Sequence, residues 1–258
     1  MKDYITYLKF DSLSKDELIE EFKNNIITHK KTFTLTPNLD FLRISYKDSA
    51  LRTIINEADY SLIDGKPIIW LARLTHKRKI FKYKISGSDF ATDLLDVANK
   101  NGYSIVLFGG KNGIAEKAKE KILGKYPNIV VKLTLCPDFG YEKDAEKSLK
   151  YVEMINNAKA DIVFLCTGCP KTEKFFFKNK DLFNDATYLS VGATIDFWAG
   201  NIKRAPKWMS KVGLEWFYRL TKDFRRLFKR YWLDFLFLLK IILICLLKKK
   251  KIQKLRGE

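Results

Sequence analysis

Small and polar residues follow the apolar runs of the first 200 residues, and most residues that could do chemistry lie at these junctions. Asp64 ends one run and precedes Gly65, and a lone carboxylate there could be the general base for a hydroxyl. It could also be the N-cap of a helix expected at Pro67–Leu74. Asp196 has the same ambiguity, because it could bind ribose hydroxyls or cap the next turn.

A glycine turn, Gly109-Gly110, opens an expected helix and could present backbone N–H groups to a phosphate. It is neither a G-x-G-x-x-G fingerprint nor a Walker A loop, and an ordinary tight turn explains it equally well. The chain has no D-x-D pair to hold a divalent metal on a diphosphate. We therefore expect cationic side chains and backbone dipoles to activate the donor, with no metal and no cofactor.

The four cysteines include one C-x-x-C pair, Cys166 and Cys169, without a second pair or a histidine cluster. The only histidines are His29 and His76, so a zinc site is not expected. We interpret the pair as loop-lining residues rather than a redox motif.

The chain alternates short β-branched runs with amphipathic stretches, which predicts an α/β fold: a Rossmann-like, open, mostly parallel sheet with helices on both faces. Ligands should bind beyond the carboxyl ends of its strands. The expected strands are Thr32–Leu35, Tyr60–Ile63, Ser104–Phe108, Ile129–Leu135, Asp161–Leu165 and Thr187–Val191. The expected helices include Ser88–Lys100, Asn112–Lys125, Lys143–Lys159 and Thr172–Asn179.

Charge divides the chain near residue 201. The net charge is +18, and residues 201–258 hold 17 Lys/Arg against 4 Asp/Glu, which leaves only +5 for residues 1–200. We therefore expect a core at 1–200 and a basic, aromatic appendage at 201–258. Such concentrated charge requires an anionic partner, either nucleic acid or anionic lipid.

An apolar run, Tyr231–Leu247, lies within this appendage and is interrupted by Asp234 and Lys240. It falls short of the roughly 20 apolar residues that span a bilayer, and charges inside a span are costly. Basic residues flank it on both sides, so we expect a helix that lies in or dips into the membrane interface. The N-terminus has no signal-peptide apolar segment, which predicts the cytoplasmic face of the membrane.

The pieces TPNLDFL, ADYSLIDGKPIIW, SGSDF, VLFGGKNG, CTGCPKTEKF, VGATIDFWAG and KRAPKWMSKVGLEWFYRL occur in this order. The ordered set resembles the WecB/TagA/CpsF glycosyltransferase family, also called glycosyltransferase family 26. The resemblance implies an inverting, metal-independent transfer of an N-acetylmannosaminyl or related hexosyl group from a UDP-sugar. The implied acceptor is a sugar on undecaprenyl diphosphate, in cell-surface polysaccharide or teichoic acid biosynthesis.

The resemblance also implies roles for single residues. Asp64 would be the catalytic base, Thr36 and Asn38 would line the donor pocket, Tyr141 would stack on uracil, and Asp196 would take the ribose. Further donor-binding positions are Lys84, Gly109, Gly110, Gly168, Pro170, Lys171 and Thr172. The arginines expected to neutralise a diphosphate are Arg219, Arg226 and Arg230.

Two positions depart from the family pattern. Lys84 replaces an arginine and so loses the bidentate guanidinium fork. Thr172 replaces a glutamine, and its hydroxyl reaches less far than an amide. These changes leave the donor sugar open, and a hexosyl donor other than N-acetylmannosamine fits as well.

Two other functions compete with the transferase. A basic, aromatic segment is also typical of single-strand nucleic-acid binders, although the apolar run at 235–247 argues against one. A nucleotide-sugar dehydrogenase or epimerase should have a dinucleotide glycine fingerprint and a Tyr-x-x-x-Lys pair. The sequence lacks the fingerprint, and the residue four places after Tyr141 is Ala145.

Overall fold

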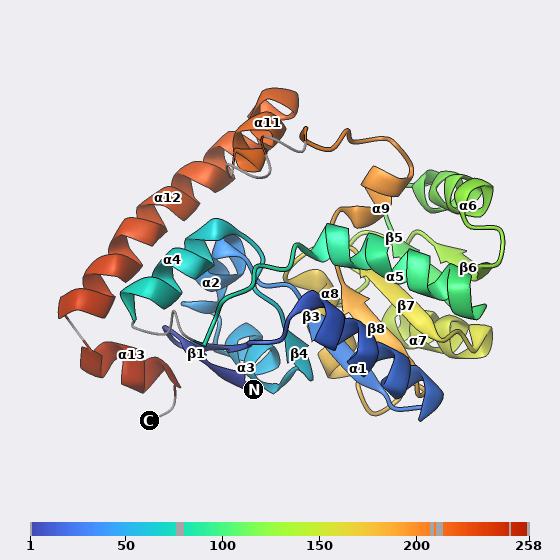
Figure 1. Cartoon of the computed structure of the whole chain (residues 1–258), viewed down its shortest axis with the longest axis horizontal. Helices are drawn as coiled ribbons and strands as arrows, with labels where there is room; N and C mark the ends of the chain where they lie inside the picture. The colour runs from blue at the N-terminus through green and yellow to red at the C-terminus, as the bar shows by residue number, and fades with distance from the viewer. Residues whose placement is uncertain (1, 76–79, 207–208, 210–213, 248, 257–258) are drawn as a thin grey trace.

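The fold comes from a computed structural model that describes residues 2–75, 80–206, 209, 214–247 and 249–256. For positions 226, 249–251 and 254 it describes the backbone alone. Figure 1 shows an α/β body with a long helix along one side.

Six parallel strands form the central sheet, in the order β4-β3-β8-β7-β5-β6. The prediction of an open parallel sheet, and of where its strands lie, is therefore confirmed. The strands are β3 (Thr32–Leu35), β4 (Tyr60–Ser61), β5 (Ser104–Gly109), β6 (Val130–Leu135), β7 (Ile162–Cys166) and β8 (Thr187–Ser190).

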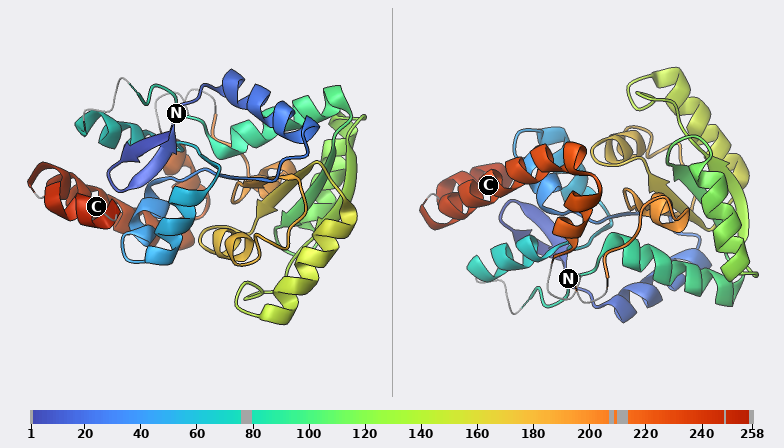
Figure 2. Two further views of the ribbon diagram at one scale, coloured as in Figure 1. Left: turned by 90° about the horizontal axis from the view of Figure 1, so that it is seen from below. Right: turned by 90° about the horizontal axis from the view of Figure 1, so that it is seen from above.

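Helices cover both faces of the sheet (Figure 2). Strand side chains alternate between two apolar clusters, so that Ile105 and Leu107 join one and Val106 and Phe108 join the other. The first cluster includes α1 (Lys15–Ile27), α5 (Gly87–Asn101), α6 (Ile114–Lys125) and α9 (Thr194–Trp198). The second includes α2 (Leu39–Ser45), α3 (Ser49–Glu57), α4 (Lys66–Leu74), α7 (Ala145–Ala158) and α8 (Lys171–Lys178).

An N-terminal hairpin, which we did not predict, joins β1 (Lys2–Ile5) to β2 (Leu8–Asp11) in antiparallel register. It packs in the second cluster, against α3 and α4. The last helix, α13 (Lys249–Arg256), returns to this hairpin, and Arg256 Nε donates to the Thr6 carbonyl at 2.8 Å.

The appendage contains α11 (Glu215–Lys222) and α12 (Phe224–Leu247). Helix α12 runs without a break through Tyr231, the first residue of the predicted apolar run. Its inner face buries Leu227, Phe237, Ile241 and Ile244, and it packs on α2 and α4. In the described part of the chain, no helix is both long and apolar enough to cross a membrane.

Candidate active site

The strand register brings the carboxyl ends of four strands together. Ser190 lies beside both Leu35 and Leu165, and Gly109 lies beside Cys166. The loops that follow β3, β8, β7 and β5 therefore begin side by side at one edge of the sheet. These loops carry most of the predicted donor-binding residues.

Asp64 lies at this edge, just after β4, where its N–H donates to the Pro37 carbonyl at 3.2 Å. Protein surrounds most of the carboxyl group, although the residue keeps some contact with solvent. Burial raises the pKa of Asp64 to about 6, Lys84 and Arg219 oppose this increase, and Glu215 adds to it. Gly65 occupies the N-cap of α4, so the helix-cap alternative for Asp64 is wrong.

Thr36 and Asn38 form the loop after β3. Thr36 is buried and its hydroxyl donates to the Ser190 carbonyl at 3.3 Å, while the Asn38 side chain caps α2 by accepting from the Asp40 N–H at 3.0 Å. A Cβ on Gly87 would lie 2.5 Å from Thr36 Oγ1. The start of α5 is therefore packed directly on this loop.

Tyr141 does not present a free ring to the site. It is 2% exposed, its ring packs against Phe108 and Phe175, and its hydroxyl lies 2.7 Å from Thr167 Oγ1. Thr172 is fully buried and lies 2.8 Å behind Thr167, hydroxyl to hydroxyl. In this arrangement a uracil cannot stack on Tyr141 unless the packed rings separate. Of the three hydroxyl-bearing residues, Thr167 is the half-buried one, while Tyr141 and Thr172 are buried.

Phe139, which we did not predict, is the exposed aromatic residue of the same loop. Its side chain is 94% exposed, and Lys171 Nζ lies 4.5 Å from the ring centroid. The loop is tied to the glycine turn, because Cys136 Sγ contacts the Gly110 carbonyl at 3.1 Å. The available signal was an aromatic residue beside Gly140 outside any expected strand or helix.

Close packing around the turn at Gly109-Gly110 leaves little room for a side chain at either position. Gly109 has a φ of +136°, and a Cβ there would lie 2.6 Å from the backbone of Cys166. Gly110 has a φ of +79°, and its Cβ would meet Ile114 at 3.0 Å. These contacts support the interpretation of Gly109-Gly110 as a tight turn. Phosphate binding at this turn stays a prediction.

The turn before α8 holds Gly168, at a φ of +84°, and Pro170, at the N-cap, and Lys171 is the first residue of the helix. Glu173, which follows, is fully buried and accepts from the Ser190 hydroxyl at 2.5 Å. Burial raises the pKa of this carboxyl group. The turn is therefore anchored from below to the end of β8.

Burial raises the pKa of the Cys166 thiol to about 12 and raises that of Cys169 as well. Both thiols are free. Reactive cysteines need a lowered pKa, so these values argue against a redox motif. Cys169 lies in the loop as expected, whereas the loop-lining interpretation is wrong for Cys166, which is the buried last residue of β7. Within the described residues, no group of three or more His, Cys, Asp or Glu side chains could hold a metal ion.

Two arginine side chains lie over the ring of Phe197 in α9. Arg219 lies 4.9 Å and Arg204 lies 5.4 Å from its ring centroid. Arg204, which we did not predict, also pairs with Asp89 at 2.5 Å and so fixes the first residues of the appendage to the start of α5. Asp196 lies beside Phe197 in α9 and accepts from Asn201 Nδ2 at 3.0 Å.

The three predicted arginines differ in position. Arg219 lies close enough to influence Asp64. Arg230 instead pairs with Asp40, Nε to Oδ2, at 3.1 Å. The side chain of Arg226 lies outside the described part of the structure.

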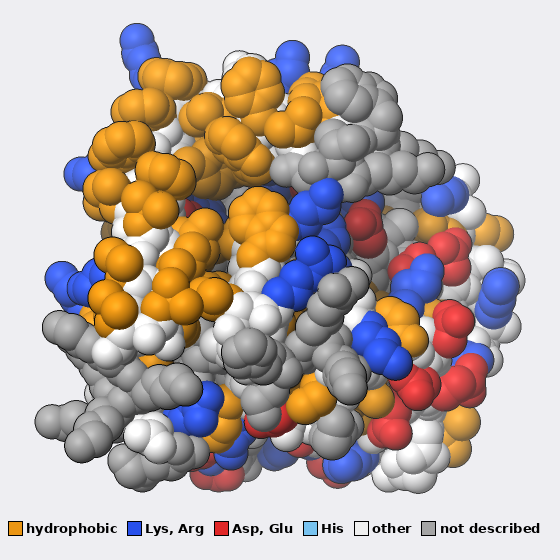
Figure 3. Space-filling view, turned by 60° about the vertical axis from the view of Figure 1, so that its left-hand side comes forward, with side chains coloured by type: hydrophobic (Ala, Val, Ile, Leu, Met, Phe, Trp, Pro, Cys, Tyr) orange, Lys and Arg blue, Asp and Glu red, His pale blue; other side chains and the backbone are white. Residues whose placement is uncertain are grey.

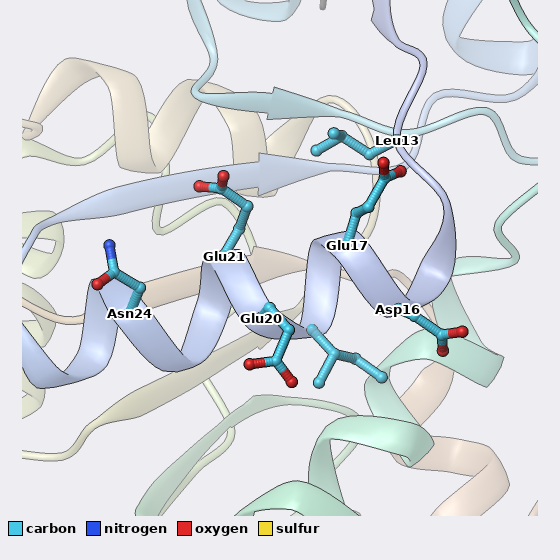
Figure 4. Close-up of a pocket in the computed structure, with 7 residues that line it drawn as sticks. Leu13, Asp16, Glu17, Glu20, Glu21 and Asn24 are labelled. Atoms are coloured by element: carbon cyan, nitrogen blue, oxygen red, sulfur yellow. The ribbon is translucent and has the colours of Figure 1, made fainter.

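A separate depression runs along α1 (Figure 4). Its lining is acidic, and none of the predicted site residues belongs to it. The residues that line it are Leu13, Asp16, Glu17, Ile19, Glu20, Glu21 and Asn24. A diphosphate would be repelled there, so the carboxyl edge of the sheet remains the candidate site.

The sequence of this chain is similar to those of known proteins. A model of the "Glycosyl transferase WecG/TagA/CpsF family" matches residues 4–252. The chain belongs to this family. A Bacillus subtilis N-acetylglucosaminyldiphosphoundecaprenol N-acetyl-beta-D-mannosaminyltransferase is 36% identical over 187 residues, covering 72% of this chain and 69% of that protein. A Staphylococcus aureus protein of the same name is 26% identical over 222 residues, or 84% of each chain.

Proposed function

We propose that this glycosyltransferase moves an N-acetylmannosaminyl or related hexosyl group from a UDP-sugar to a sugar on undecaprenyl diphosphate, in cell-surface polysaccharide or teichoic acid biosynthesis. The names of its relatives support the acceptor class. The observation that carries the proposal is Asp64, a carboxylate at the carboxyl edge of the sheet whose pKa burial raises to about 6, with Lys84 and Arg219 near enough to oppose the increase. A general base works best when its pKa lies near the working pH.

In this mechanism Asp64 takes the proton of the acceptor hydroxyl while the hydroxyl oxygen attacks C1 of the donor sugar. The bond between C1 and the diphosphate oxygen breaks with its electron pair, and UDP leaves. A single displacement inverts the configuration at C1. Lys84 and Arg219, which both lie near Asp64, stabilise the charge that develops on the diphosphate, so the transfer requires no metal.

The donor lies across the loops of the carboxyl edge. Thr36, Asn38, Lys84 and the turns at Gly109-Gly110 and 168–171 surround its sugar and diphosphate, and Asp196 takes the ribose. The exposed ring of Phe139, with Lys171 beside it, offers the base a stacking surface. Tyr141 and Thr172 do not contact the donor. They hold the hydroxyl of Thr167 in position by hydrogen bonds.

The outer face of α12 supports peripheral attachment to the cytoplasmic face of the membrane, where the lipid acceptor resides. Of the 20 large apolar side chains that are exposed among the described residues, 13 lie between 214 and 247. Figure 3 shows how these apolar side chains gather over the helix. The face is formed by Phe224, Phe228, Trp232, Phe235, Leu239, Leu243 and Leu246. A basic helix with such a face binds a bilayer through apolar insertion and charge together.

The test is transfer by the purified full-length protein. UDP-sugars would be offered in turn with a synthetic GlcNAc-diphospholipid, and the product would be identified by mass and its anomeric configuration by NMR. We expect one inverted product that forms equally well in EDTA. If no UDP-sugar is transferred the proposal fails, and if Mg²⁺ or Mn²⁺ must be added the metal-free mechanism is wrong.

A second measurement addresses the anionic partner. Co-sedimentation with anionic vesicles would be compared with a gel-shift assay on single-stranded oligonucleotides at the same salt concentration. We expect binding to the vesicles. Binding to the oligonucleotide alone would favour the nucleic-acid function instead.

A further inference from the structure

Four charged side chains of alternating sign lie between α2 and α12, and we call them the charge cluster: Asp40 and Arg43 from α2, Arg230 and Asp234 from α12. Arg43 Nε lies 2.6 Å from Asp234 Oδ1, and Arg43 also pairs with Asp40. Arg230 Nε lies 3.1 Å from Asp40 Oδ2 and 3.9 Å from Asp234 Oδ2. Each carboxylate therefore faces both guanidinium groups.

The cluster lies within an otherwise apolar contact. Asp40 is 8% exposed and Asp234 is 6% exposed, while Phe237 and Ile241 pack one and two turns away on the same face of α12. A buried carboxylate is strongly destabilising unless it is paired. Apolar side chains tolerate sliding along a neighbouring helix, whereas a shift of one turn, about 5.4 Å, would break both pairs that join the two helices, Arg43 with Asp234 and Arg230 with Asp40. The cluster therefore selects one register of α12 on the core.

The charge cluster adjoins two segments of the candidate active site. The Asp40 N–H is capped by Asn38 in the loop after β3, and the charge of Arg230 acts on Cys169 in the turn before α8. Helix α11, which carries Arg219 to the neighbourhood of Asp64, packs against α12. The register of α12 on α2 thus fixes where Arg219 lies.

We propose that Asp40, Arg43 and Asp234 are positioning residues that dock the appendage in the one register that holds Arg219 beside Asp64. Arg230 belongs to the docking contact and faces the donor turn at 168–171. The proposal rests on the transferase function. It also assigns a purpose to Asp234, the acid that interrupts the apolar run.

The experiment replaces Asp234 in the full-length protein and measures transfer to a soluble acceptor analogue. In Asp234→Leu we expect kcat to fall by about 10- to 100-fold, because small displacements of a catalytic group have effects of this size. The KM for the UDP-sugar should change little. Asp234→Glu should retain most of kcat, because its carboxylate can still pair.

A double variant tests the pairing itself. Arg43→Met with Asp234→Leu removes both partners, so it should be more active than either single variant. Glu57→Gln is the matched control, because it breaks an ion pair between core segments, Glu57 with Lys180 at 4.0 Å, far along the chain from the appendage. Its kcat should equal that of the wild type.

Hydrogen exchange separates docking from folding. In Asp234→Leu, amides of α11 and α12 should exchange faster while those of β5 and β7 keep their protection. If kcat stays within twofold of the wild type, or falls while α11 and α12 stay protected, the proposal is wrong. If β5 and β7 also lose protection, the isosteric Asp234→Asn decides: wild-type activity in that variant overturns the proposal. An inactive wild type would refute the proposed function, while the exchange comparison would still test the docking.

Discussion

The sheet and the appendage differ in how far their apolar side chains are buried. Strands β5 and β7 are buried along their whole length, because helices cover both faces of the sheet. Helix α12 buries one face on α2 and α4 and leaves Phe228, Trp232 and Leu239 exposed on the other. Helix α12 therefore adds side chains to the second core cluster from one face and keeps a contiguous apolar surface on the other, which is typical of an interaction site.

The two regions also divide the chemistry. In the proposed mechanism the core supplies the carboxylate of Asp64 and the narrow turns that receive the donor, and the appendage adds Arg219. A change in the core should therefore affect the reaction itself. A change in the appendage should affect charge stabilisation or access to the lipid.

The largest effect is expected in the core, for Asp64→Asn. An amide cannot accept the proton, so kcat should fall by roughly 10²- to 10⁴-fold. Because the pKa of Asp64 is raised from 3.8 to about 6, its ionisation lowers the stability of the fold progressively between these two pH values, and the full loss is present at pH 7. The variant should therefore unfold less readily at pH 7, by on the order of 1–3 kcal/mol. Single-turnover rates and urea unfolding test both statements, and a variant with a near-normal rate would remove Asp64 from the mechanism.

The largest effect from the appendage is expected for Arg219→Leu. The loss of one cation near the developing diphosphate charge should reduce kcat by roughly 10- to 100-fold. Arg219→Lys should retain more activity, since the charge remains. Steady-state kinetics with a soluble acceptor measure the effect, and equal rates for the two variants would show that charge at this position is unimportant.

The pH profile sharpens the division between core and appendage. Because Asp64 must be ionised and its pKa is about 6, kcat/KM should fall about tenfold per unit as the pH drops below 6. Glu215 raises this pKa and Arg219 lowers it, so Glu215→Gln should move the midpoint down and Arg219→Leu should move it up. Rate profiles between pH 4.5 and 8 for the three proteins suffice, and a common midpoint would contradict the assignment.

A smaller effect is expected at the edge of the core, for Phe139→Ala. Stacking on an aromatic ring contributes roughly 1–3 kcal/mol per base, so the KM for the UDP-sugar should rise by about fivefold or more with kcat little changed. Phe139→Trp should keep a low KM. Leu149→Ala, which also shortens an exposed apolar side chain, is the control, and an unchanged KM in Phe139→Ala would place the base elsewhere.

The smallest catalytic effect is expected on the outer face of α12. Replacing Phe228 and Leu239 by Gln should lower the fraction bound to anionic vesicles several-fold, because each buried apolar side chain contributes about 1.5–3 kcal/mol. Transfer to a soluble acceptor should change much less than transfer to lipid in vesicles. Unchanged co-sedimentation would mean that this face does not contact the bilayer.

The sequence predicted the sheet because its strands are continuous apolar runs, and such runs in a parallel sheet are buried on both faces. It also placed Asp64 at a strand end. It could not show that Tyr141 is enclosed by Phe108 and Phe175, since these contacts join segments that are distant in the chain. Asp234 likewise looked like an interruption of an apolar run, because its partner Arg43 comes from the other end of the chain.

The contact between Gly87 and Thr36 has a consequence for how this protein can diverge. A methyl group on residue 87 would overlap both the hydroxyl and the methyl group of Thr36, at 2.5 and 2.9 Å. The side chains at positions 36 and 87 therefore compete for one small volume, so a substitution at one position limits which residues are acceptable at the other. A larger residue at 87 becomes acceptable only in a lineage that has first shortened residue 36, so their substitution histories should be linked and ordered.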